Sequence, residues 1–141
     1  PNGSNLFISF GEIDCRPDEG FVFAATKHKK KIDNLVSNTV QGYINWFIKQ
    51  NKNKNHNLYF FNIPAPIYNK NFSTESNKEV SRIITLFNRN LAENLSHYDL
   101  CLVDVFKFTV GYNGFSNGLY HVDTHHLGNN AIFEIEKQFH I

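Results

Sequence analysis

Residues 57–63 read Asn-Leu-Tyr-Phe-Phe-Asn-Ile, and the run is ended by Pro-Ala-Pro at residues 64–66. A short continuous apolar run before prolines predicts a β-strand that is buried on both faces. Residues 5–10 and 100–106 are apolar runs of the same kind, and Gly11 stops the first of them. The sequence therefore predicts three buried strands.

The segments between these strands have the apolar spacing of helices. In residues 32–48 and 73–95 apolar side chains recur along one helical face, and Ser73 or Ser76 is expected to cap the second helix. A last short helix is expected within residues 129–139. Alternation of continuous apolar strands with long helices indicates a three-layer α/β fold with a parallel sheet.

Three neighbouring parallel strands would leave such a domain incomplete. Right-handed crossovers would place both long helices on one face of the sheet, so only the last helix would cover the other face. The first strand would present a bare apolar edge. We therefore expect residues 1–141 to be a single domain that is the C-terminal part of a larger α/β domain, completed by a missing N-terminal segment or a partner chain.

The composition excludes several classes of protein. Of the 141 residues 41% are hydrophobic, and the net charge is +1, so neither nucleic acid nor a membrane is an expected partner. No apolar run approaches the ~20 residues that span a bilayer. Cys15 and Cys101 are expected at opposite ends of parallel strands, too far apart for a disulfide. Two free thiols favour a cytoplasmic location.

Residues 120–128 read Tyr-His-Val-Asp-Thr-His-His-Leu-Gly and follow a loop rich in Gly and Asn. Asp123 stands three residues before His126, which puts a carboxylate within reach of an imidazole. A carboxylate on one ring nitrogen fixes the tautomer, so the other nitrogen can accept a proton from a nucleophile. We predict a catalytic Asp123–His126 dyad at the carboxyl ends of the strands, the rim where sites form in parallel sheets.

Two other interpretations of this segment remain open. In extended backbone His121, Asp123 and His125 would share one face, and such a set could hold zinc or another divalent ion in a metal-dependent hydrolase. Alternatively, Asp123 and His126 could merely cap the last helix. A non-catalytic binding or scaffold domain is also open, and in it Asp123 and His126 would lie out of hydrogen-bond reach.

Two sequence blocks resemble those of a known superfamily. Residues 11–16 (Gly-Glu-Ile-Asp-Cys-Arg) resemble the third block, Gly-x-Asn-Asp, of the SGNH (GDSL-like) hydrolases, and residues 123–127 (Asp-Thr-His-His-Leu) resemble their fifth block, Asp-x-x-His-Leu. The resemblance spans nearly the whole chain and implies the C-terminal part of a flavodoxin-like domain.

The resemblance also implies an activity. It suggests an ester hydrolase or O-acyltransferase that uses a Ser-His-Asp triad, without a cofactor, on an ester-bearing small molecule or an acylated glycan. His126 would be the general base, Asp123 its orienting carboxylate, and Gly11 would border the oxyanion site. The nucleophile block Gly-Asp-Ser has no counterpart in the sequence, so the serine would lie outside this chain, and the isolated chain is expected to be inactive.

The third block also departs from the family pattern. Its Asn, whose amide donates to the oxyanion, is Ile13 here, and we predict that Arg16 replaces it as a cationic donor. Asp14 is expected to hold the loop together by accepting backbone hydrogen bonds. Ser9 is interpreted as a strand residue and Ser116 as a turn residue.

Overall fold

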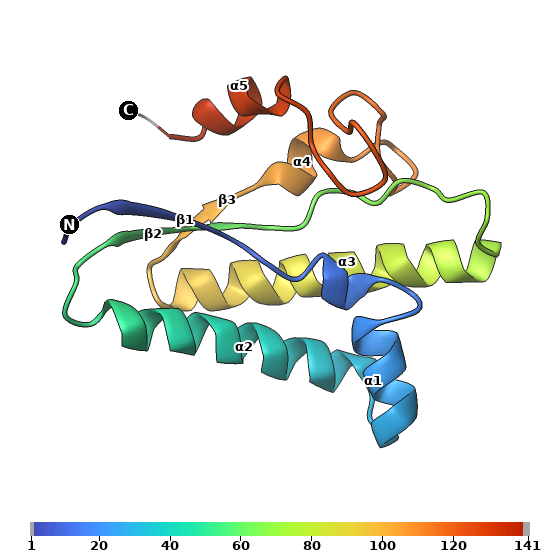
Figure 1. Cartoon of the computed structure of the whole chain (residues 1–141), viewed down its shortest axis with the longest axis horizontal. Coiled ribbons are helices and arrows are strands. Elements are labelled where there is room, and N and C mark those ends of the chain that lie inside the picture. The colour runs from blue at the N-terminus through green and yellow to red at the C-terminus, as the bar shows by residue number, and fades with distance from the viewer. Residues whose placement is uncertain (1, 140–141) are drawn as a thin grey trace.

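The three strands form one parallel sheet. The structure, a computed structural model, describes residues 2–139. Strands β1 (Asn5–Ser9), β2 (Asn57–Phe61) and β3 (Cys101–Val103) lie in the order β1-β2-β3, and both pairs are parallel (Figure 1). The sheet confirms the expected α/β fold.

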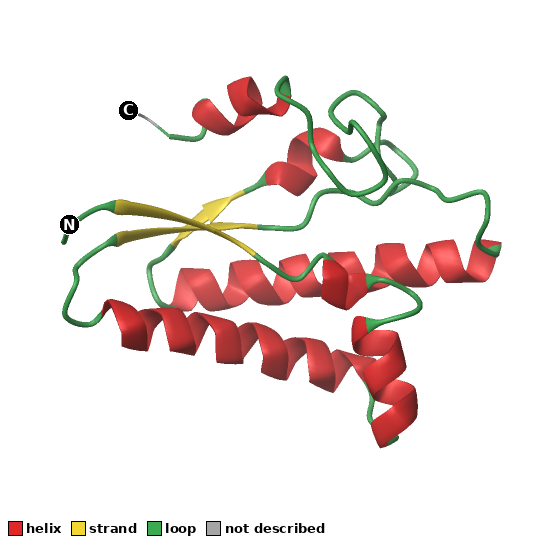
Figure 2. Cartoon of the chain, viewed as in Figure 1, coloured by secondary structure: helices red, strands yellow, loops and turns green. Residues whose placement is uncertain are grey.

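Two long helices cover one face of this sheet. Helices α2 (Ile32–Asn51) and α3 (Thr74–His97) run side by side beneath the strands (Figure 2). The apolar stripe of each helix faces the sheet, and the core forms between these layers. Its largest fully buried side chains include Phe60, Phe87 and Leu91. Both crossovers thus lie on the same face, as the right-handed rule predicts.

The serine cap is at the first of the two expected positions. The hydroxyl of Ser73 accepts a hydrogen bond from the backbone N–H of Ser76 at 3.0 Å, and α3 begins at the next residue after Ser73. This bond satisfies one of the backbone donors that the first turn of a helix leaves free.

Two short helices were not predicted. The apolar residues of helix α1 (Gly20–His28) form one short block, residues 21–25, without helical spacing, and charged residues follow it. The helix ends at His28, and its C-cap residue Lys29 has a left-handed φ of 52°. Helix α4 (Val105–Thr109) begins where the third strand was expected to continue. The reason is Asp104, whose carboxylate accepts from the backbone N–H of Lys107 and so caps a helix.

The opposite face of the sheet is only partly covered. Helix α5 (Ala131–Glu136) lies on this side (Figure 1). The ring of Phe7 contacts those of Tyr59 and Phe139, yet Phe7 keeps 55% of its surface exposed. Within residues 2–139 the β1 strand pairs with β2 alone. The bare edge expected from the sequence is therefore present.

The described residues also bear on two expectations from composition. None of the helices within residues 2–139 combines the length and the apolar character needed to cross a membrane. Cys15 is buried just after β1, Cys101 is exposed at the start of β3, and both are free thiols.

Candidate active site

The loops that follow the strands meet at one rim of the sheet. After β1 the chain turns at Gly11 and forms a short 3-10 helix, η1 (Ile13–Cys15). Gly11 has a φ of +96°, and a Cβ atom there would overlap the ring of Phe87. Both facts require glycine. This turn is the one that the sequence places beside the oxyanion site.

A folded loop over residues 110–128 carries the Asp/His segment. An isolated antiparallel bridge joins Val110 to Ser116, and a second joins His121 to Leu127. The second bridge closes a tight turn, in which the N–H of Val122 donates to the carbonyl of His126 at 3.0 Å. The turn holds residues 123–126 away from the body of the loop.

Asp123 and His126 make the contact that the sequence predicts. The two side chains meet at 2.7 Å between Oδ2 of Asp123 and Nδ1 of His126. The other carboxylate oxygen, Oδ1, accepts the backbone N–H groups of His125 and His126, both at 2.8 Å. These bonds, first that from the His125 backbone, hold the pKa of Asp123 well below its ordinary value. The carboxylate is therefore ionised and fixed in direction.

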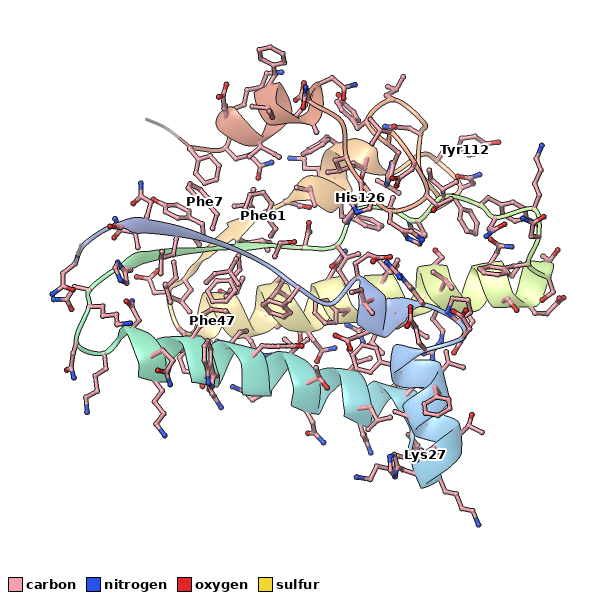
Figure 3. All side chains as sticks on the ribbon, viewed as in Figure 1. Phe7, Lys27, Phe47, Phe61, Tyr112 and His126 are labelled. Carbon is pink, nitrogen blue, oxygen red and sulfur yellow. The ribbon has the colours of Figure 1, made fainter. Side chains whose placement is uncertain are left out.

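Of the two ring nitrogens of His126, Nδ1 is hydrogen-bonded and Nε2 is not, within residues 2–139. With Asp123 ionised, Nδ1 carries the proton and donates it, so the unprotonated Nε2 can act as an acceptor. Within residues 2–139 no hydrogen bond reaches Nε2, and the side chain is 75% exposed. His126 lies on the loop above the carboxyl ends of the strands (Figure 3). Nε2 is therefore accessible to a group from outside the described residues.

The pair does not cap the last helix. Helix α5 begins at Ala131, and its N-cap residue is Asn130. Asp123 and His126 belong to the turn that precedes this helix. The helix-cap interpretation of these two residues is therefore wrong.

A second carboxylate–imidazole pair lies beside the first. Nδ1 of His125 is 2.7 Å from Oε1 of Glu12, at the start of η1. Glu12 also accepts two hydrogen bonds from Arg16, at 3.1 and 2.7 Å, and Arg16 bonds Glu19 at 3.1 Å. The i,i+4 spacing of Glu12 and Arg16 indicates their ion pair. Nothing in the sequence indicates that His125, from the other end of the chain, joins it.

Arg16 is held by carboxylates on the rim. Its hydrogen bond to Glu12 is the main reason why its pKa is raised. The guanidinium still has N–H groups beyond those that bind Glu12 and Glu19. The side chain of Ile13, in the position of the family's Asn, is 59% exposed.

Asp14 does not act as expected. Its side chain accepts no hydrogen bond from residues 2–139, so it does not tie the loop together with its carboxylate. Partial burial raises its pKa instead. The backbone of Asp14 lies so close to Gly20 that a Cβ on Gly20 would overlap it.

The residues of the metal hypothesis have separate partners. Nδ1 of His121 bonds the hydroxyl of Ser116 at 2.9 Å, whereas Asp123 binds His126 and His125 binds Glu12. Burial lowers the pKa of His121, and nearby His125 adds to this effect. In the part of the chain that the structure describes, no three His, Cys, Asp or Glu side chains are placed to hold a metal ion together. The structure thus separates the predicted ligand set.

Two hollows adjoin the site. The first is a cavity lined by Glu12, His125 and His121, among others. The second is a more open depression that holds His126 together with Ser9 at the end of β1, and Glu12 and His125 line it too. The Glu12–His125 pair therefore stands between the two hollows. Neither Ser9 nor Ser116 bonds His126.

Comparison with known proteins identifies the fold. No family model matches the sequence, and a search of curated proteins found no match. A solved GDSL-like lipase from Bacteroides thetaiotaomicron VPI-5482 superposes with a TM-score of 0.62 at 16% identity, over 96% of this chain and 63% of that one. A structure from Streptococcus pneumonia, described as a candidate platelet activating factor, superposes with a TM-score of 0.60 at 15% identity, over 96% of this chain and 57% of that one. The chain thus shares the α/β fold of these two structures, and it spans about three fifths of the length of these two proteins.

Proposed function

We propose that this chain, on the GDSL-like (SGNH) hydrolase fold that it shares with these proteins, supplies the His–Asp part of a serine ester hydrolase or O-acyltransferase. The observation that carries the proposal is the 2.7 Å contact between Asp123 and Nδ1 of His126, with Nε2 facing outward at the carboxyl ends of the strands. In open parallel sheets this rim is where substrates bind.

Each group has a defined part in the reaction. A serine hydroxyl attacks the ester carbonyl carbon, and Nε2 of His126 takes the hydroxyl proton. Asp123 stabilises the imidazolium that forms. His126 then gives this proton to the departing alcohol, which leaves the acyl group on the serine. Water, or a second hydroxyl in a transferase, attacks the acyl-enzyme with His126 again as base and releases the acid or the new ester.

The hydrogen bonds that hold the Asp123 carboxylate in place support its proposed role as the group that orients His126. An imidazole that is mostly exposed would sample many orientations without a partner. Two backbone N–H groups hold the Asp123 carboxylate, and the carboxylate in turn orients the ring of His126. Groups that are positioned before the reaction need no costly rearrangement in the transition state.

The serine in this proposal lies outside the chain. Ser116 is engaged with His121, and Ser9 makes no bond to His126. The open depression beside His126 adjoins the end of edge strand β1. A strand added to this edge, from a preceding segment or a partner chain, would end beside His126. Gly11 and Arg16 would border the oxyanion there, and the substrate would be an ester-bearing small molecule or an acylated glycan.

The experiment is turnover of p-nitrophenyl acetate by the complete protein. His126→Ala is expected to lower kcat/KM by roughly 10³–10⁴-fold, because the reaction loses its general base. His97→Ala changes an exposed histidine at the end of α3, away from the rim, and is the matched control. It should leave kcat/KM within about twofold of the parent value.

Two results would count against the proposal. Equal turnover by the parent and His126→Ala would show that the imidazole is not the base. Loss of activity with EDTA, restored by a divalent ion, would favour the metal-dependent hydrolase instead.

A further inference from the structure

The cavity behind the Glu12–His125 pair is built by four segments that are distant in sequence. They are η1, the loop after β2, the first half of α3 and the 110–128 loop. Apolar side chains, among them Ile63, Ala65 and Ile84, line its inner part. These three residues are buried in the core, so the cavity has a rigid inner wall.

The cavity adjoins the position of the reacting ester in the proposed function. Glu12 and His125 line both this cavity and the depression that contains His126. An ester carbonyl attacked by a serine beside His126 would therefore have one of its two substituents facing the Glu12–His125 pair, the wall that the cavity shares with the depression. The chemistry of the lining decides which substituent fits.

The size of the cavity favours a small substituent. Its volume is about 70 Å³, counted for the centre of a water-sized sphere. This is space for roughly five water molecules, and hence for an acyl chain of about two to four carbons. A fatty acyl chain of eight carbons or more would not be enclosed.

The charged side chains that line the cavity are paired. Arg16 is paired with Glu12 and with Glu19. Burial lowers the pKa of His121 and so disfavours a positive charge on this histidine. Because Arg16 already binds two carboxylates, a third carboxylate from a substrate would gain little there, and the lining suits an uncharged chain better.

The most buried polar residue of the lining, Asn77, already has hydrogen-bond partners. The amide of Asn77 accepts from the N–H of Asn69 and donates to the carbonyls of Asn69, Phe72 and Ser73. No donor of this amide remains for a sugar hydroxyl. The cavity therefore suits the apolar acyl side of an ester better than a polar alcohol.

We infer that this cavity holds the acyl group of the substrate and selects uncharged acyl chains of about two to four carbons. The inference rests on the proposed ester chemistry at His126. It assigns Phe115, which lines the cavity from the 110–128 loop, as a residue that limits chain length.

The test is a chain-length series of p-nitrophenyl acetate, butyrate and octanoate with the complete protein. We expect kcat/KM for acetate or butyrate to exceed that for octanoate at least about tenfold. Phe115→Ala should widen the cavity. It should raise the octanoate-to-acetate ratio, which is kcat/KM for octanoate divided by kcat/KM for acetate, by about tenfold. Phe115 is half-buried, with its ring against Tyr68, so the change leaves the core intact.

Tyr112→Ala is the matched control, because it removes an aromatic ring from the same loop. Tyr112 is fully exposed and projects outward from the protein (Figure 3). The ratio of kcat/KM for octanoate to kcat/KM for acetate should be the same in Tyr112→Ala as in the parent protein. Val80→Ala, which enlarges the cavity from α3, gives a second independent variant if Phe115→Ala does not fold.

The outcomes separate the two proposals. Hydrolysis that depends on His126 but is equally fast for acetate and octanoate overturns the acyl-pocket inference alone. An octanoate-to-acetate ratio that Phe115→Ala and Val80→Ala leave unchanged also overturns it. If the complete protein hydrolyses none of the three esters, the proposed function fails and the inference fails with it.

Discussion

At the scale of single residues, the proposed function depends on how a short turn holds one carboxylate. Asp123 uses Oδ1 for two backbone N–H groups and Oδ2 for the imidazole of His126. The first two bonds fix the carboxylate within its own turn, so the third can orient a side chain that is otherwise exposed. The lowered pKa of Asp123 keeps this carboxylate charged even in mildly acidic solution.

Asp123→Asn tests this arrangement. An amide can keep the acceptor for the backbone, but its NH₂ group would face Nδ1 of His126 and favour the wrong tautomer. We expect kcat of the complete protein to fall roughly 10⁴-fold, as loss of an orienting carboxylate does in other triads. Ester turnover and the thermal midpoint should be measured together. A large loss of stability instead of activity would contradict the assignment, and Asp18→Asn, at an exposed site, is the control.

The sequence predicted the residues that interact locally and missed those that interact across the chain. Asp123 and His126 are three positions apart, so their contact follows from a turn. The contact between Glu12 and His125 depends on how η1 and the 110–128 loop pack together, and no local pattern carries this information. Asp14 was assigned the wrong contact for the same reason, because its environment is set by the close approach of Gly20.

At the scale of elements, the turn after β1 is the position least tolerant of change. Gly11→Ala would place a methyl group into the ring of Phe87 in a backbone conformation that L-residues avoid. We expect the free energy of unfolding to fall by about 3 kcal/mol from strain and overpacking combined. The measurement is urea denaturation.

Gly42→Ala is the control for that experiment. Gly42 lies inside helix α2, and a Cβ there would meet nothing within 4 Å. Alanine should raise the free energy of unfolding by about 0.5–1 kcal/mol, because glycine is a poor helix former. If Gly11→Ala and Gly42→Ala changed the free energy of unfolding by similar amounts, this result would contradict the role given to the Gly11 turn.

The predictions of elements succeeded where apolar periodicity was long. Helices α2 and α3 and the three strands were all expected from the sequence, with small differences at their ends. Helices α1 and α4 are short, so their few apolar positions carry little periodic signal. In α4 the cap decides the structure: Asp104 and the buried amide of Asn62 take up the first backbone N–H groups. This cap ends the third strand at Val103.

At the scale of the whole molecule, the two faces of the sheet differ sharply. Helices α2 and α3 bury one face, whereas Phe7 on the other is half exposed and β1 is an edge strand within the described residues. Exposed apolar edges favour further pairing. The two similar structures are longer than this chain. In the proposed function, a further strand beside β1 would cover this edge and bring a nucleophile to His126.

The most direct test is to locate the serine that His126 activates. The complete protein is treated with a fluorophosphonate, which reacts with activated serines, and the labelled residue is identified by mass spectrometry. The account predicts one labelled serine outside residues 1–141 and no label in His126→Ala. Label on Ser9 or Ser116, or label that persists in His126→Ala, would contradict it.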